Sequence, residues 1–486
     1  MLRIGYILAI MSSSGTQNSG FGAARLGVSA LFGALILLIG MSLTPGGGWT
    51  APLVLGLCGA VLMALMIGAN DAANMMASSV GARLISLPAA LLIAAVCEIA
   101  GAMIGARAVV ETVGTGLIVD PTPAHHDPLL LAMIAAPFAA ALWIGLATFL
   151  RLPVSTTHSL VGAITGAGLA MLGADMIAWD MLGRIGLAWL WSPALGFAFA
   201  AGGFAAIQFT IVEAQDNRHA LRRALPILTG LLSTVIASYI TLKLVTDAAP
   251  LQVIGIGLGA GACVGLITLL LAKPVEQGLS LNAMAGSYLR LPILIAAASF
   301  AFAHGANDVA NAIAPFAAIK HIAASDDAGL LASMTVPRLL LALGGFGLAL
   351  GVILLGGRLT RSVARDITRL TPLSTLAALM AVGMTVLFAS TLGLPVSSTH
   401  TALAAIFGVG LAREMLTDPK WRRDRRVVRL NQSPRAAIRT ARHARHRKLV
   451  RRRGIAKIII AWLITLPAAV GMGWLMATIA NMAISF

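Results

Sequence analysis

Charged residues are scarce in this chain of 486 residues: Asp, Glu, Lys and Arg together make up 11% of it, whereas 58% is hydrophobic. Soluble domains carry about 25% charged residues, so the composition excludes an ordinary soluble protein. Many apolar runs reach roughly the 20 residues that a helix needs to cross a bilayer. Because these runs are continuous and do not alternate with polar residues, they exclude a membrane barrel and predict helices.

Cysteines are also few. Cys58, Cys97 and Cys263 all fall inside apolar runs, so no disulfide framework is predicted. The first ten residues, MLRIGYILAI, are too short for a secretory signal and lack a cleavage context. We therefore expect an all-α, polytopic membrane protein with about 12–13 transmembrane helices. The expected spans are 27–44, 51–74, 88–106, 129–150, 153–173, 185–212, 225–245, 251–272, 291–315, 336–356, 373–393, 395–413 and 455–480.

Positive charge is concentrated in one segment. Residues 413–457 hold 17 Lys or Arg and three acids, a net charge of +14 against +17 for the whole chain. A basic run can bind nucleic acid, but between apolar spans it is typical of a cytoplasmic loop, and contact with anionic lipid is compatible with that. No nucleic-acid partner is predicted. The other charged loops then place the N-terminus inside and the C-terminus outside.

Three motifs occur twice, in the same order. They are GANDAAN at 68–74 and GANDVAN at 305–311, PVSTTH at 153–158 and PVSSTH at 395–400, and RIGLAWLWSP at 184–193 and KIIIAWLITLP at 457–467. The spacing from Asn70 to His158 is 88 and from Asn307 to His400 is 93, which indicates a duplication. The predicted topology gives the two halves opposite orientations. We therefore expect two inverted-topology repeats with re-entrant or broken helices, as in many secondary transporters.

The repeats divide the chain into successive parts. They are an N-terminal segment with an extra helix (1–50), repeat 1 (51–212), a linker with two helices (213–290), the first part of repeat 2 (291–412), the basic cytoplasmic loop (413–457) and the last helix of repeat 2 (458–486).

Each GAND motif puts a carboxylate, Asp71 or Asp308, in an apolar run, at a cost of about 2.5–3.5 kcal/mol. The neighbouring asparagines add hard oxygen ligands, and Gly68 and Gly305 would let the helix break and free backbone carbonyls. The alternative is a polar network between helices that is already satisfied. The expected cation ligands are Asn70, Asp71, Asn74, Asn307, Asp308 and Asn311, with Na⁺ at Asp71, Asn74, Asp308 and Asn311.

The PVS[ST]TH motifs predict the complementary half of a site. Pro153 and Pro395 suit the first turn of a helix, where free N–H groups and the helix dipole attract an anion. Ordinary N-capping by Ser or Thr is the alternative. The expected oxyanion ligands are Ser155, Thr156, Thr157, Ser397, Ser398 and Thr399, joined by Asp71 and Asp308.

Three further residues are candidates for coupling. His158 and His400 end the PVS[ST]TH motifs and could carry a proton, bind the oxyanion or pack between helices. Glu98 is the lone acid of its span. His304 precedes the second GAND motif, but Ile67 holds the equivalent position in the first, so we place His304 outside the symmetric site.

These motifs, with CEIAGAMIG and AWLITLP, resemble the inorganic phosphate transporter (PiT) family over residues 51–212 and 291–480. The resemblance implies cation-coupled phosphate uptake through about 12 helices, with the aspartates holding cations and the Ser/Thr turns holding phosphate. Sodium-coupled relatives tend to carry a second buried glutamate where this chain has Leu379. The coupling ion, Na⁺ or H⁺, therefore stays open, and because some bacterial relatives carry sulfate, so does the anion.

We thus predict a symporter that imports inorganic phosphate across the cytoplasmic (inner) membrane of a bacterium by alternating access, with no cofactor. The alternatives are a sulfate permease, a channel and an intramembrane hydrolase built on Ser155 and His158. The duplicated motif without an asymmetric partner argues against an enzyme. Membrane proteins of this kind often form homodimers, although no residue identifies an interface.

Overall fold

The structure is a computed structural model, and it describes residues 19–42, 50–119, 125–271, 288–324, 334, 336–366, 370–417 and 452–484. The regular secondary structure of these residues is helical, apart from one isolated bridge between Ile118 and Ile177. Residues 418–451, most of the predicted basic loop, lie outside the described residues. The first half comprises α2 (Ser19–Ser42), α3 (Ala51–Gly81), α4 (Leu87–Gly105), α5 (Arg107–Thr115), α6 (His126–Phe149), α7 (Thr156–Met171) and α8 (Trp179–Ile207).

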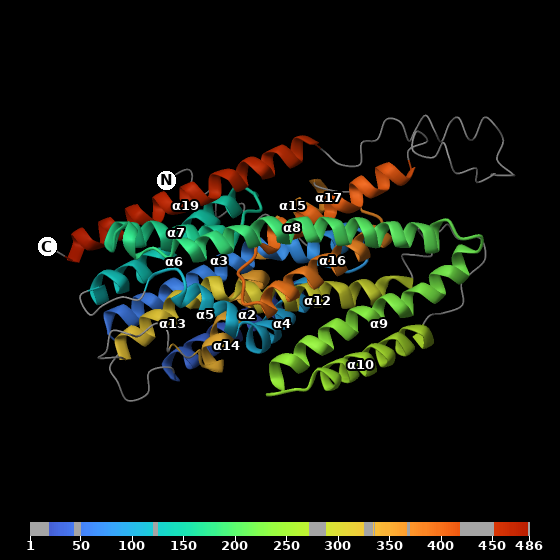
Figure 1. The fold of residues 1–486 in the computed structure, drawn as a ribbon, viewed down its shortest axis with the longest axis horizontal. Helices are drawn as coiled ribbons and strands as arrows, with labels where there is room; N and C mark the ends of the chain where they lie inside the picture. Colours follow the sequence, from blue (N-terminus) through green and yellow to red (C-terminus); the bar gives the residue numbers. More distant parts are fainter. Residues whose placement is uncertain are drawn as a thin grey trace.

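The remaining helices follow a short π-helix, η3 (Gln208–Val212). They are α9 (Asn217–Leu244), α10 (Pro250–Leu271), α12 (Arg290–Asp308), α13 (Ala310–Ala324), α14 (Arg338–Gly351), the π-helix η5 (Val352–Gly356), α15 (Gly357–Asp366), α16 (Pro372–Thr391), α17 (Ser398–Thr417) and α19 (Arg452–Ile484). The long helices run side by side, while α9 and α10 form a pair at one edge (Figure 1). Helix α3 is central and packs against α6, α13, α14 and α15.

Ten helices among the described residues are long and apolar enough to cross a membrane, which confirms a polytopic membrane protein. The predicted number of 12–13 is not reached. Three predicted spans, 27–44, 153–173 and 395–413, do not qualify as membrane-crossing helices. Helix α7 has only 16 residues, about 24 Å at 1.5 Å per residue, so it is too short to cross the hydrocarbon core. Helix α17 is long enough, but its polar first turn and charged last turn lower its hydropathy.

The surface of the bundle is apolar where the outer helices face outward. Leu251 and Leu270 of α10 are 81% and 74% exposed, and Leu463 of α19 is 72% exposed. By contrast, α12 and α16 are buried along most of their length. This pattern fits a protein whose periphery contacts lipid and whose centre is enclosed by other helices.

Glycines bring the helices with the GAND motifs close to their neighbours. A Cβ atom at Gly68 would clash with the backbone of α14 at Leu348, and one at Gly305 would clash with the backbone of α4 at Glu98. Small residues allow such contacts between membrane helices. The prediction that Gly68 breaks its helix is wrong, because α3 runs unbroken through the motif and Gly68 serves close packing instead. In the second copy the helix is interrupted at Val309, after the motif's aspartate.

Candidate functional site

The two GAND motifs lie at the centre of the bundle. Asp71 is in the middle of α3, and Asp308 is the last residue of α12. Both aspartates and Asn311 are fully buried, and Asn74 is partly buried. The folding of two apolar helices through the centre therefore places two carboxylates where water does not reach them.

Each PVS[ST]TH motif forms a serine turn, which we define as residues 153–158 for the first and 395–400 for the second. Ser155 is the N-cap of α7 and accepts a hydrogen bond from the backbone N–H of His158 (3.2 Å). Ser397 accepts the equivalent bond from His400 (3.2 Å). The prediction that proline occupies the first helical turn is wrong. Pro153 lies in the non-helical segment before the serine cap.

Each aspartate contacts the serine turn of its own half. The hydroxyl of Thr156 donates to Asp71 Oδ2 (3.1 Å), and the hydroxyl of Ser398 donates to Asp308 Oδ2. The structure thus brings together in each half the two motifs that the sequence pairs.

The motifs also cross between halves. Thr399 of the second turn donates to Asp71 Oδ1 (3.2 Å), and Asn74 Nδ2 donates to Thr399 Oγ1 (2.8 Å). In the other direction, Asn311 Nδ2 donates to Thr157 Oγ1 (3.1 Å). The four motifs therefore form one centre rather than two separate sites.

His304 lies in the middle of this centre. Its Nε2 is 2.8 Å from Asp308 Oδ2 and 3.3 Å from Asp71 Oδ2, and its Nδ1 is 2.7 Å from Glu98 Oε1. All four side chains are fully buried. Sequence reasoning missed this residue because its counterpart is Ile67. The useful signal was its position four residues before Asp308, which puts both side chains on one helix face.

Glu98, a predicted coupling residue, reaches the site through His304. It lies on α4, and its second oxygen, Oε2, makes no hydrogen bond with the residues that the structure describes. Leu379, which the sequence flagged as a departure, is buried in α16 and packs in an apolar core. Three carboxylates, those of Asp71, Glu98 and Asp308, therefore surround His304.

His158 and His400 lie in a stack of four rings. His158 stacks on Trp189 of α8 with 3.7 Å between ring centroids, and His400 lies 3.9 Å from Trp462 of α19. The two histidine rings are 4.6 Å apart. His158 Nδ1 also lies 2.6 Å from Ser155 Oγ. The ring contacts agree with packing between helices, one of the three interpretations from sequence.

Oxygen atoms that could hold a cation are available at both aspartates. One ligand atom each from Asp71, His304 and Asp308 lies within 4.8 Å of the others. Asn311 Nδ2 is 3.4 Å from Asp308 Oδ1, and because a carboxylate only accepts, this contact fixes the orientation of the amide. Asn311 Oδ1 is buried and makes no hydrogen bond within the described part of the chain. It is a free hard ligand beside a carboxylate.

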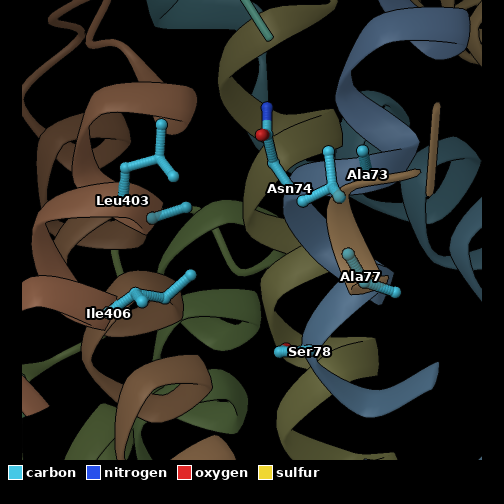
Figure 2. Close-up of a pocket in the computed structure, with 9 residues that line it drawn as sticks. Ala73, Asn74, Ala77, Ser78, Leu403 and Ile406 are labelled. Atoms are coloured by element: carbon cyan, nitrogen blue, oxygen red, sulfur yellow. The ribbon is translucent and has the colours of Figure 1, made fainter. Parts of the chain in front are cut away.

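A pocket leads away from the centre on one side, between α3, α15 and α17. Figure 2 shows Asn74 at its upper end and Ser78 further along α3. Residues on its walls include Ala73, Asn74, Ala77, Ser78, Leu403 and Ile406. Ala314 lies on α13, which packs against α5, and it is buried in an apolar core. Ala77 therefore borders a pocket, whereas its counterpart in the second half, Ala314, lies in an apolar core.

Comparisons with known proteins agree with this arrangement. A "Putative phosphate permease" of Pyrococcus abyssi is 35% identical over 86% of this chain and 94% of its own length. "Inorganic phosphate transporter 2-1, chloroplastic" of Arabidopsis thaliana is 34% identical over 72% of this chain and 64% of its own length. Among solved structures, "The sodium-dependent phosphate transporter" is 28% identical, with a TM-score of 0.75 over 89% of this chain and 100% of the other.

The sequence model of one family matches residues 67–473, a range that includes both GAND motifs and both serine turns. That family consists of transporters and not of enzymes, which removes the hydrolase alternative. The chain belongs to the Phosphate transporter family.

Proposed function

We propose that this protein is a symporter that couples inorganic phosphate uptake to a cation gradient and works by alternating access. The observation that carries the proposal is the single buried centre in which two GAND motifs and two serine turns meet. Two carboxylates enclosed in a membrane protein need compensating charge, and a cation that is bound and released would supply it.

The serine turns are suited to the anion. Each begins a helix whose first N–H groups have no partner within the helix, so the starts of α7 and α17 attract negative charge. The residues that we assign to phosphate are Ser155, Thr156, Thr157, Ser397, Ser398 and Thr399. Positive charge from two helix dipoles is partial, which is a reason for cations to accompany the phosphate.

Na⁺ is our first choice of coupling ion. Asp71 with Asn74, and Asp308 with Asn311, offer carboxylate and amide oxygens, the ligands that hard cations prefer. The name of the structural neighbour, a sodium-dependent phosphate transporter, also supports Na⁺. The other ionisable groups at this centre are Glu98 and His304, which contact each other and lie beside the two aspartates. A proton-driven transporter is the alternative outcome of the transport experiment described in the Discussion.

Matched contacts support inverted repeats, which we place at 51–212 and at 291–412 together with 458–486. Gly68 meets Leu348 and Gly351 meets Leu65, while Gly305 meets Glu98 and Gly101 meets Phe302. Each pair of helices thus makes two such contacts, and on both helices the two contacting residues are three positions apart in sequence. The pocket beside Asn74 would be the open, cytoplasmic path, and the core at Ala314 the closed, outer one.

Phosphate is a better choice of substrate than sulfate, since the family and the relatives above are named for phosphate. These relatives include an archaeal and a chloroplast protein. The expectation of a bacterial cytoplasmic membrane therefore stays a prediction, as does the homodimer.

Thermal unfolding of the purified protein tests the proposed ligands. The unfolding temperature is measured with phosphate or sulfate, in sodium chloride or in choline chloride. A ligand that binds the folded state raises this temperature. We expect phosphate to raise it in sodium chloride and to have a smaller effect in choline chloride. Equal effects of sulfate, or no effect of phosphate in either salt, would contradict the assignment.

A further inference from the structure

The two asparagines of each GAND motif have different environments. Asn70 Nδ2 donates to Thr148 Oγ1 (2.9 Å) and to the carbonyl of Leu152 (3.2 Å), and its Oδ1 accepts from the backbone N–H of Val154 (3.2 Å). The amide thus uses both its donor and its acceptor side on the end of α6 and on the non-helical segment that begins the first serine turn.

The second half repeats this arrangement atom for atom. Asn307 Nδ2 donates to Ser390 Oγ and to the carbonyl of Leu394, both at 3.1 Å, and its Oδ1 accepts from the N–H of Val396 (3.1 Å). Both asparagines are buried. Because the oxygen faces an N–H donor and the nitrogen faces a carbonyl, neither amide can be turned over without breaking these bonds.

The segments held in this way need external partners. Leu152–Val154 and Leu394–Val396 are non-helical and buried at their centres, and the proline in each has no N–H to donate. Buried backbone groups without a partner cost about 1–3 kcal/mol each. Asn70 and Asn307 act like a short length of neighbouring backbone, pairing one carbonyl and one N–H two residues apart.

A second set of bonds joins the two segments. Thr157 Oγ1 of the first turn donates to the carbonyl of Val396 (3.0 Å). Thr399 Oγ1 of the second turn lies 3.1 Å from the carbonyl of Val154, which shares the single proton of this hydroxyl with Asp71 Oδ1. Each valine is therefore held at its N–H by the asparagine of its own half and at its carbonyl by a threonine of the other half. The two helix starts form one rigid unit.

We propose that Asn70 and Asn307 are positioning residues that lock the two serine turns into one anion-binding frame, while Asn74 and Asn311 supply the cation ligands. This replaces our expectation that all four asparagines bind cations, and it rests on the proposed function. Asn311 Oδ1, which is free, and Asn70 Oδ1, which is bonded to Val154, mark the difference.

The test measures phosphate uptake by the full-length protein in liposomes, using the Na⁺ or H⁺ gradient that drives the wild type. Asn70→Ala and Asn307→Ala are compared with Asn311→Ala. Two measurements are made for each variant: the KM for phosphate, and the cation concentration that gives half-maximal uptake at a fixed multiple of that KM. Thr148→Val and Ser390→Ala remove only the hydroxyl partner of each positioning asparagine, so they are milder versions of the same change.

We expect Asn70→Ala and Asn307→Ala to raise the KM for phosphate by about tenfold, because each removes the buried hydrogen bonds that hold one serine turn in place. The cation requirement should change by less than about twofold, whereas Asn311→Ala should raise it. Thr148→Val and Ser390→Ala should raise the KM by about threefold, and these variants decide the matter if the alanine variants do not fold.

A raised cation requirement with unchanged KM in Asn70→Ala would make Asn70 a ligand and overturn the proposal. An unchanged KM for phosphate in both single variants, Thr148→Val and Ser390→Ala, would also overturn the proposal. The proposed function fails separately, if the wild type takes up no phosphate under either gradient.

Discussion

Thr399 donates a hydrogen bond to Asp71 across 328 residues of sequence, and the distance is 3.2 Å. The contact joins the serine turn of one half to the GAND motif of the other. An anion held at the turn and a cation held at the carboxylate would therefore be neighbours, so binding one would favour binding the other.

Replacing Thr399 by valine should weaken this linkage. Thr399→Val keeps the shape of the side chain but removes the donor to Asp71 that comes from the other half, while Thr156 and Asn74 still donate to this carboxylate. We expect kcat/KM for phosphate to fall about tenfold or more. Labelled uptake in liposomes checks it. Thr401→Val is the matched control, because Thr401 donates only to the carbonyl of Ser397 in its own turn, and it should change uptake by less than about threefold.

The histidine between the carboxylates makes a prediction about stability. His304→Ala leaves Glu98, Asp71 and Asp308 buried together without a donor between them, and removing one partner of a buried charged group costs about 3–5 kcal/mol. The unfolding temperature of the variant in detergent should fall. Adding Glu98→Gln should restore part of the loss, because one of the three like charges is gone. If the double variant is no more stable than His304→Ala, repulsion between the buried carboxylates is not the cause of the loss.

The sequence predicted which motifs belong together, because a duplication shows every motif twice at similar spacing. The reliance on symmetry also caused the main omission. His304 has no counterpart in the first half and was placed outside the site, although it contacts both aspartates. The contacts between a serine turn of one half and a GAND motif of the other depend on how the helices pack. No local sequence pattern predicts them.

The length and composition of an apolar run were also insufficient to predict whether it forms one membrane-spanning helix. The run at 153–173 is apolar enough for a membrane span, yet it contains an extended segment and a helix of 16 residues. A glycine such as Gly68 is compatible with either a helix break or close packing, and only the position of α14 decides between them.

Glycine substitutions can separate these two roles. A methyl group at Gly68 or Gly305 would press on the backbone of the adjacent helix, so Gly68→Ala and Gly305→Ala should lower the unfolding temperature and reduce phosphate uptake. Gly255→Ala on α10 is the control, since nothing lies within 4 Å of its added methyl group. It should be as stable as the wild type or slightly more stable. Equal behaviour of all three variants would show that the close contacts are unimportant.

Asymmetric access can be measured with single cysteines. Ala77 lines the pocket, and Ala314, six residues after the second aspartate as Ala77 is after the first, is sealed in the apolar core. In a background without Cys58, Cys97 and Cys263, Ala77→Cys should react with a membrane-impermeant thiol reagent from the side of the basic loop. Ala314→Cys should stay unlabelled from either side in the conformation described. Labelling of Ala314→Cys as fast as Ala77→Cys would contradict the asymmetry.

The central claim is that two buried aspartates couple a cation gradient to phosphate movement. Labelled phosphate uptake into liposomes, with Na⁺ and H⁺ gradients imposed separately, tests it most directly for the wild type, for Asp308→Asn and for the control Asp127→Asn at the exposed start of α6. We predict accumulation driven by one gradient, preferably Na⁺, that is lost in Asp308→Asn and retained in Asp127→Asn. Phosphate uptake that depends on neither gradient, or gradient-driven uptake that is retained in Asp308→Asn, would contradict the account.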